Sequence, residues 1–262
     1  MMTNARDHAF FDVPRMPYRT SLGVVDLPIL YYDVTNVVAL FEASRAGVDE
    51  LLEGTGLCAG LVQGDTATVG LSFYEYRDSS VGSYNEVGTA LLAVREGQRR
   101  PMLKIAELLR SPRRRTLGAY VVDLPVTTEL ACAGGREIYG YPKFVTDISF
   151  LRRGRDFRSA VLDPDGDAAI CELAGKMGMG VPSPPLSLMT YTLLDGALLR
   201  THVDVRGRSW THAPGSMQLD VGPSDHPMAR NLRTLGLDGA RPTVVMATDR
   251  FQSLLHAGTW VR

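Results

Sequence analysis

One lysine, Lys143, stands in an aromatic and apolar stretch that could make it a nucleophile. Residues 135 to 144 read Gly-Arg-Glu-Ile-Tyr-Gly-Tyr-Pro-Lys-Phe. Only a neutral amine attacks a carbonyl carbon, and a lysine with the ordinary pKa of about 10.4 is neutral about once in 2500 molecules at pH 7. Burial among Tyr139, Tyr141 and Phe144 would penalise the ammonium form and lower that pKa. The alternative is a surface lysine whose methylenes lie along a ring while its ammonium stays in water.

This stretch resembles the Schiff-base lysine motif of the acetoacetate decarboxylase family, in which a Gly-Arg-Glu run is followed by an aromatic residue, proline and the reacting lysine. On that match Lys143 takes the place of the nucleophile. Acetoacetate decarboxylase is itself the standard example of a lysine activated by desolvation or by a cationic neighbour, so this mechanism comes with the resemblance.

Other segments are similar to the family in the expected order. Ser83-Tyr84-Asn85-Glu86 resembles the turn and strand that carry an active-site glutamate, and residues 213–219 and 225–229 resemble the closing barrel segment. The resemblance therefore implies Lys143 and Glu86 as catalytic residues, with Tyr84 and Tyr141 in contact with the substrate. Without the resemblance, Glu86 would be read as an exposed strand carboxylate.

Two departures from the family pattern affect the expected substrate. A second lysine follows the nucleophile in the best-known decarboxylases, whereas this chain has Phe144. If the segment is a strand, neighbouring side chains point to opposite faces, so residue 144 need not line the same pocket. The family also places an arginine near the start of its first barrel strand to engage the substrate carboxylate, but residues 23–34 contain none, and Arg15 and Arg19 lie upstream. Imine chemistry is thus better supported than decarboxylation of acetoacetate itself.

The resemblance implies a lyase that acts on a small keto acid without a metal or organic cofactor. The protonated imine would accept the electron pair released when carbon dioxide leaves a β-keto acid. Glu86 would orient the substrate or handle protons, and its carboxylate must not sit so close that it stabilises the charged lysine. The first alternative is an aldolase-dehydratase that condenses pyruvate with an aldehyde, an activity also found among relatives. The second is a barrel that binds a small molecule without turnover.

Composition favours a small-molecule partner. The chain has 262 residues, 45% of them hydrophobic, and a net charge of -1, which gives no general attraction to nucleic acid or to an anionic membrane. Cys58, Cys132 and Cys171 show neither a metal spacing nor a disulfide framework, which fits a reducing cytoplasm. No segment is long and apolar enough to cross a bilayer. We expect one domain over residues 1–262, a cytoplasmic location and, from the habits of the family, a homo-oligomer.

Short strand-like runs dominate the chain, with Gly, Pro or Asp turns between them. This pattern predicts a mainly β fold with flanking helices (α+β), built on an antiparallel closed sheet or cone-like β-barrel. Helical spacing of apolar residues predicts a helix over residues 37–52, and a second short helix is predicted over 102–109. The predicted strands are 29–32, 67–76, 86–94, 117–122, 145–151, 168–173, 188–194, 198–205 and 243–248.

Residues 95–115 form a strongly basic segment with eight Arg and Lys residues against Glu96 and Glu107. It is either a solvated insertion between strands, or a subunit contact or clamp in which an arginine replaces the missing carboxylate partner. Residues 175–180 lack the spacing of a phosphate-binding loop, and the histidines show no helical metal pair, so we predict no metal site.

Overall fold

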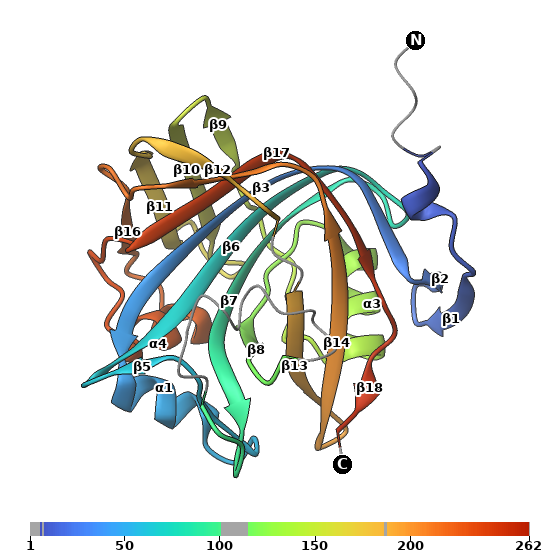
Figure 1. Ribbon diagram of the computed structural model, residues 1–262, viewed down its shortest axis with the longest axis horizontal. Helices are drawn as coiled ribbons and strands as arrows, with labels where there is room; N and C mark the ends of the chain where they lie inside the picture. Colours follow the sequence, from blue (N-terminus) through green and yellow to red (C-terminus); the bar gives the residue numbers. More distant parts are fainter. Residues whose placement is uncertain (1–5, 7, 101–114, 186–187, 262) are drawn as a thin grey trace.

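The computed structural model describes residues 6, 8–100, 115–185 and 188–261, and its main feature is one large curled sheet (Figure 1). Neighbouring strands follow the order β17, β3, β6, β7, β8, β13 and β14, and β14 pairs back with β17 to close a ring of hydrogen bonds. All these pairs are antiparallel except β8 with β13. The predicted mainly β closed sheet is therefore confirmed. The bounds are β3 Ile29–Ser44, β6 Thr66–Ser79, β7 Tyr84–Arg95, β8 Gly118–Asp123, β13 Leu188–Leu194, β14 Ala197–Arg206 and β17 Val244–Leu255.

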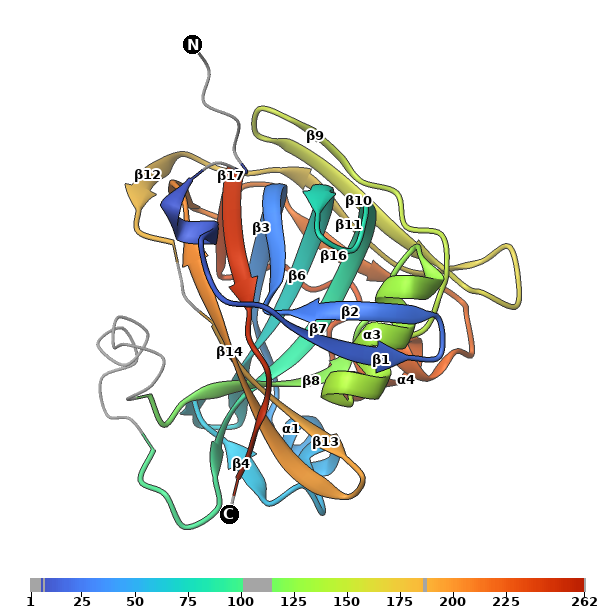
Figure 2. The ribbon, with the colours of Figure 1, turned by 90° about the vertical axis from the view of Figure 1, so that its right-hand side faces the viewer.

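Smaller elements extend this sheet or cover it. A second sheet has the order β16, β11, β10 and β9, and a hairpin of β1 and β2 lies across helix α3 (Figure 2). In the described part of the chain, no helix has the length and apolar character needed to span a membrane. The remaining bounds are a 3₁₀ helix Ala9–Phe11, β1 Met16–Thr20, β2 Gly23–Leu27, β4 Leu57–Ala59, β5 Val62–Gln63, α3 Glu129–Tyr139, β9 Leu151–Arg153, β10 Asp156–Leu162, β11 Ala169–Lys176, β12 Gly180–Ser183, β15 Ser209–His212, β16 Gln218–Val221 and β18 Thr259–Trp260.

The two faces of strand β6 have different environments. Val69, Leu71 and Phe73 are fully buried in the main hydrophobic core, where the Phe73 ring packs edge-on against Phe157 of the second sheet at 5.4 Å between centroids. Tyr74, next to Phe73, belongs to a separate cluster on the opposite face. Because side chains alternate along a strand, one face of the sheet builds the core and the other is free to build a cavity.

The predicted helix over residues 37–52 is wrong in its first half. Strand β3 continues to Ser44, and only Arg45–Leu52 forms a helix, α1, with the Ser44 side chain accepting a hydrogen bond from Gly47 N at its start. Val37, Ala39, Phe41 and Ala43 are buried at every second position, and β3 is paired with β6 and β17 on its two sides. These ladder bonds and the buried alternation outweigh the helical spacing.

Gly47 lies where α1 meets helix α4, Pro227–Thr234. A Cβ atom at this position would lie 2.2 Å from the carbonyl oxygen of Thr234, so only glycine permits this approach. The segment 225–229, expected from the resemblance to close a barrel, instead leads into α4. Residues 213–219 lead into β16 of the second sheet rather than into the ring.

Helix α3 holds the Gly-Arg-Glu run and was not predicted. It ends at Gly140, which adopts a left-handed conformation with φ of 65°. The predicted strand over 145–151 is also wrong, because residues 145 and 148 make only isolated bridges and β9 begins at Leu151. The short helix predicted over 102–109 lies outside the described residues.

Candidate active site

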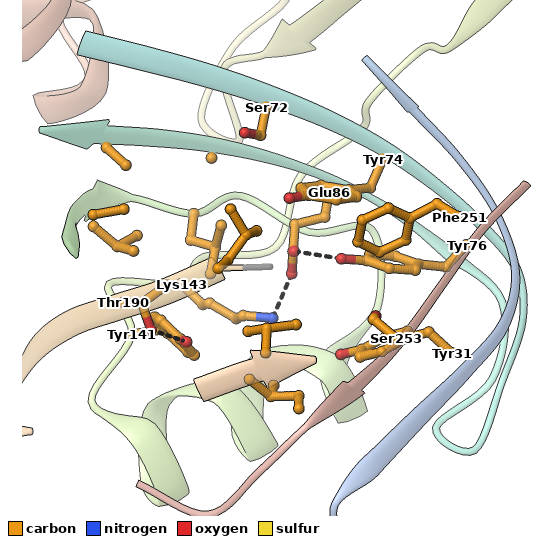
Figure 3. A pocket seen from close by; sticks show the side chains of 18 residues that line it. Tyr31, Ser72, Tyr74, Tyr76, Glu86, Tyr141, Lys143, Thr190, Phe251 and Ser253 are labelled. Atoms are coloured by element: carbon orange, nitrogen blue, oxygen red, sulfur yellow. Dashed lines mark hydrogen bonds and ion pairs between the residues drawn. The ribbon is translucent and has the colours of Figure 1, made fainter. Parts of the chain in front are cut away.

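A cavity of about 130 Å³ lies within the ring of strands (Figure 3). Every strand of the ring contributes to its wall, largely through residues at every second position, as in Ser72, Tyr74 and Tyr76 of β6. The aromatic part of the wall consists of Tyr31, Tyr74, Tyr76, Tyr141 and Phe251, and further hydroxyls come from Ser72, Thr190 and Ser253. Most of the remaining wall is small or aliphatic. The cavity is therefore apolar with a limited number of polar groups, which is typical of small-molecule sites.

Lys143 enters this cavity from an irregular segment after α3. The carbonyl oxygens of Pro142 and Phe144 accept hydrogen bonds from Leu124 N and Val126 N, so the segment is held alongside residues 124–126. Lys143 points inward, whereas the Phe144 ring lies 4.3 Å from the His226 ring and packs against the main core. Phe144 therefore does not line the cavity that Lys143 enters, although the segment is irregular and is not the strand from which that possibility was argued.

The Lys143 side chain makes a close ion pair with Glu86 of β7. Its Nζ donates to Glu86 Oε2 at 2.6 Å, and each residue is only 7% exposed. Tyr76 Oη donates to the other carboxylate oxygen, Oε1, at 3.0 Å. Glu86 is thus not the exposed strand carboxylate of the alternative interpretation, and Lys143 is not a surface lysine.

This contact differs from the expectation that the carboxylate would keep its distance from the amine. At 2.6 Å the carboxylate stabilises the ammonium, while burial acts against both charges by removing their hydration. Inside an apolar wall, transfer of the proton from Nζ to Oε2 converts a buried ion pair into two neutral groups. The structure therefore places a proton acceptor for the amine directly beside it.

Gly135 makes room for the lysine under helix α3. A Cβ atom on Gly135 would lie 2.4 Å from both Cδ and Cε of Lys143, so the helix backbone covers the lysine stem at closer range than any side chain allows. The neighbouring Gly134 has no such restriction, because a Cβ there would meet Val25 at an ordinary 3.6 Å. The first residue of the Gly-Arg-Glu run thus allows the close packing of Lys143 near the end of the motif.

The two tyrosines expected to contact substrate occupy different positions. Tyr141 lines the main cavity and shares a 2.8 Å hydrogen bond with Thr190. Tyr84 does not line the main cavity. It lines a smaller cavity of about 20 Å³ under α3, which Lys143 also borders. Its hydroxyl is 3.1 Å from that of Tyr31, and Lys143 Nζ lies 5.7 Å from its ring centroid. Tyr84 therefore backs the lysine rather than facing the main cavity.

Tyr31, Tyr74 and Tyr76 were not predicted as site residues, although alternation along β6 places the last two on one face. Burial raises the pKa of all three hydroxyls, and the negative charge of Glu86 raises it further. They therefore stay protonated at neutral pH and act as uncharged hydrogen-bonding groups around the ion pair.

Lys143 is the single cationic side chain among the described residues that line the cavity. Arg15, upstream of the first ring strand, instead pairs with Asp26 at 3.5 Å. The basic segment is described only at its ends, where Arg100 donates to the carbonyl of Ala59 at 2.9 Å, and its residues 101–114 lie outside the described ranges. The clamp suggested for that segment therefore stays a prediction.

Comparison with known proteins identifies the family. The sequence model of the family described as Acetoacetate decarboxylase (ADC) matches residues 15–232, and the chain belongs to this family. None of the curated protein sequences matches the chain.

Solved structures share the fold at low sequence identity. An acetoacetate decarboxylase is 15% identical, with a TM-score of 0.64 over 89% of each chain. The acetoacetate decarboxylase of Legionella pneumophila is 17% identical, with a TM-score of 0.63 over 96% of this chain and 92% of its own. The enduracididine biosynthesis enzyme MppR, complexed with the condensation product of pyruvate and imidazole 4-carboxaldehyde, is 14% identical, with a TM-score of 0.63 over 90% of each chain.

Proposed function

We propose that this protein is a Schiff-base-forming lyase in which Lys143 attacks the carbonyl carbon of a small molecule. The observation that carries the proposal is the buried pair of Lys143 and Glu86, 2.6 Å apart in the wall of an apolar cavity. An amine in such a site reacts once its proton has a nearby acceptor. Membership of the acetoacetate decarboxylase family supports the same chemistry.

The pair can supply each proton that imine formation needs. Lys143 first passes a proton to Glu86, and the neutral amine then adds to the carbonyl carbon to give a carbinolamine. Glu86 returns the proton to the departing hydroxyl, which leaves as water, and the nitrogen becomes a cationic iminium next to the restored carboxylate. Tyr76 holds the carboxylate in place through its hydrogen bond to Oε1. No proton has to come from outside the cavity before the iminium forms.

Decarboxylation of a β-keto acid is the first reaction that this iminium can serve. The electron pair of the bond to the carboxylate carbon flows toward the iminium nitrogen, carbon dioxide leaves, and an enamine remains. A proton added to the enamine carbon and hydrolysis of the imine then release the ketone and free Lys143. The family to which the chain belongs supports this reaction.

An aldol addition is the second candidate, favoured by the position of Glu86. A carboxylate next to the imine nitrogen can remove a proton from the adjacent carbon, which leaves a neutral enamine and a neutral acid. The enamine carbon then attacks an aldehyde, whose oxygen takes the proton from Glu86. Among the structural neighbours, MppR has been solved with a condensation product of pyruvate and an aldehyde.

Reductive trapping tests the proposal. Wild-type protein incubated with a panel of small ketones, aldehydes and keto acids in borohydride should gain a covalent adduct, seen as an increase in intact mass. Lys143→Ala should gain none. Lys176→Ala is the matched control, because Lys176 is exposed at the end of β11, and it should behave as wild type. Trapping that persists in Lys143→Ala would contradict the assignment.

The cytoplasmic location, the single domain over 1–262 and the homo-oligomer stay predictions from sequence. The alternative is a barrel that only binds a small molecule. Such a protein would give neither a trapped adduct nor a product, so both measurements separate it from the proposed lyase.

A further inference from the structure

The charges in the cavity wall bear on what can bind there. Lys143 and Glu86 are the charged side chains among its described residues, and at 2.6 Å their charges compensate each other. The rest of that wall is aromatic, aliphatic or hydroxyl-bearing. The described cavity wall is therefore neutral as a whole and largely apolar.

A substrate carboxylate would disturb this balance. It would bring a second negative charge beside Glu86, and the described wall offers no second cation to pair with it. Imine formation does not change this charge balance. An ammonium and a carbonyl combine to give an iminium and water, so the nitrogen carries the same charge before and after. An unpaired charge buried in an apolar site is strongly unfavourable.

An uncharged substrate keeps the balance at every step. The iminium stays paired with the Glu86 carboxylate, and removal of a proton from the neighbouring carbon produces a neutral enamine and a neutral acid. The hydroxyls of Tyr141 and Thr190, which already share a hydrogen bond, are neutral groups that suit a carbonyl or hydroxyl oxygen. The wall thus matches a carbonyl compound without a charged group.

The volume of the cavity limits the size of that compound. At about 130 Å³ it is slightly smaller than an engineered cavity of about 150 Å³ that binds benzene. Tyr74 and Tyr76 stack in parallel at 5.2 Å between centroids, with Phe251 edge-on to Tyr74, and give an apolar substituent a flat surface to pack against.

We propose that the substrate whose carbonyl meets Lys143 is a small uncharged ketone or aldehyde with an apolar substituent, in place of a keto acid. This inference rests on the proposed imine chemistry and makes it more specific. It selects the aldol-type reaction, because decarboxylation requires a carboxylate on the substrate.

Pairs of probes that differ only in charge test the inference. Acetoacetamide is compared with acetoacetate, and pyruvamide with pyruvate, by the rate of borohydride trapping on wild-type protein. Each rate is divided by the rate for free Nα-acetyl-lysine, which removes the intrinsic reactivity of each carbonyl. We expect the amides to be trapped at least about tenfold faster than the acids, since a buried unpaired charge is costly.

A charge-removing variant gives an independent readout. Glu86→Gln leaves Lys143 without its counterion, so the preference for amides over acids should shrink or reverse. Glu75→Gln is the matched control, because Glu75 lies next to Tyr76 on β6 but pairs with Arg77 at 3.0 Å. It should keep the wild-type preference.

The outcomes separate the two proposals. Acids trapped as fast as amides by wild-type protein would overturn the inference while leaving the imine chemistry intact. No adduct from any probe would overturn the proposed function itself. The wild-type comparison decides the inference even if Glu86→Gln does not fold.

Discussion

Replacement of Gly135 by alanine should displace the side chain of Lys143 directly. The new Cβ would lie 2.4 Å from Cδ and Cε of Lys143, about 1 Å closer than ordinary van der Waals contact begins. The helix backbone is fixed by its own hydrogen bonds, so the flexible lysine stem must move. A displacement of about 1 Å at a reacting group costs about 100-fold in rate.

The matched control is Gly134→Ala, one position earlier on the same helix. Its Cβ would meet Val25 at an ordinary 3.6 Å, so Lys143 should keep its position. In an isolated helix, either substitution would stabilise the helical state by about 1 kcal/mol. Any loss of trapping rate that is seen only in Gly135→Ala therefore comes from the contact with Lys143 and not from helix propensity.

The assay measures the rate of imine trapping at saturating carbonyl probe, together with thermal unfolding of each variant. We expect Gly135→Ala to be slower than wild type by about 100-fold while Gly134→Ala stays within about twofold, as its contact geometry permits. Equal trapping rates in the two variants, both folded, would show that Gly135 is not required for the placement of Lys143.

Three further predictions follow from buried groups. Burial raises the pKa of Asp123 to about 7, so the folded state holds a proton that the unfolded state loses near pH 4. The free energy of unfolding, measured by urea titration, should therefore fall by about 3 kcal/mol from pH 5 to pH 8, and Asp123→Asn should remove that part of the pH dependence. Tyr76→Phe should lower kcat about tenfold with little change in KM, because Glu86 loses a hydrogen-bond donor; steady-state kinetics that show only a raised KM would contradict this. Gly47→Ala should destabilise the fold by about 2 kcal/mol or more in denaturant unfolding, because its Cβ would lie 2.2 Å from the backbone of Thr234, and an unchanged midpoint would refute that packing.

Lys143 and Glu86 could be proposed as site residues from the sequence, but the geometry of their contact could not. The Gly-Arg-Glu motif pointed to Lys143, and the resemblance pointed to Glu86, yet the two residues are 57 positions apart. Their contact depends on how the segment after α3 lies against residues 124–126 beside β7. Such long-range placement leaves no local pattern, so the direct ion pair was not foreseen.

Local patterns were reliable where a single periodicity applied. Strands β7, β13 and β14 begin and end within about two residues of their predicted bounds, a normal margin for such assignments. The local pattern was misleading over residues 37–44, where helical and alternating spacing coincide. There the pairing of β3 with β6 and β17 on its two sides determined the structure. Helix α3 was missed because Gly134 and Gly135 disfavour helices, although Gly135 is required there by Lys143.

The location of the trapped adduct tests directly whether Lys143 is the reacting amine. Wild-type protein reduced with borohydride in the presence of a carbonyl probe is digested, and the modified peptide is sequenced by mass spectrometry. We expect a single modified lysine per chain, at position 143. An adduct found only on Lys176, or none with any carbonyl probe that the protein consumes, would contradict it.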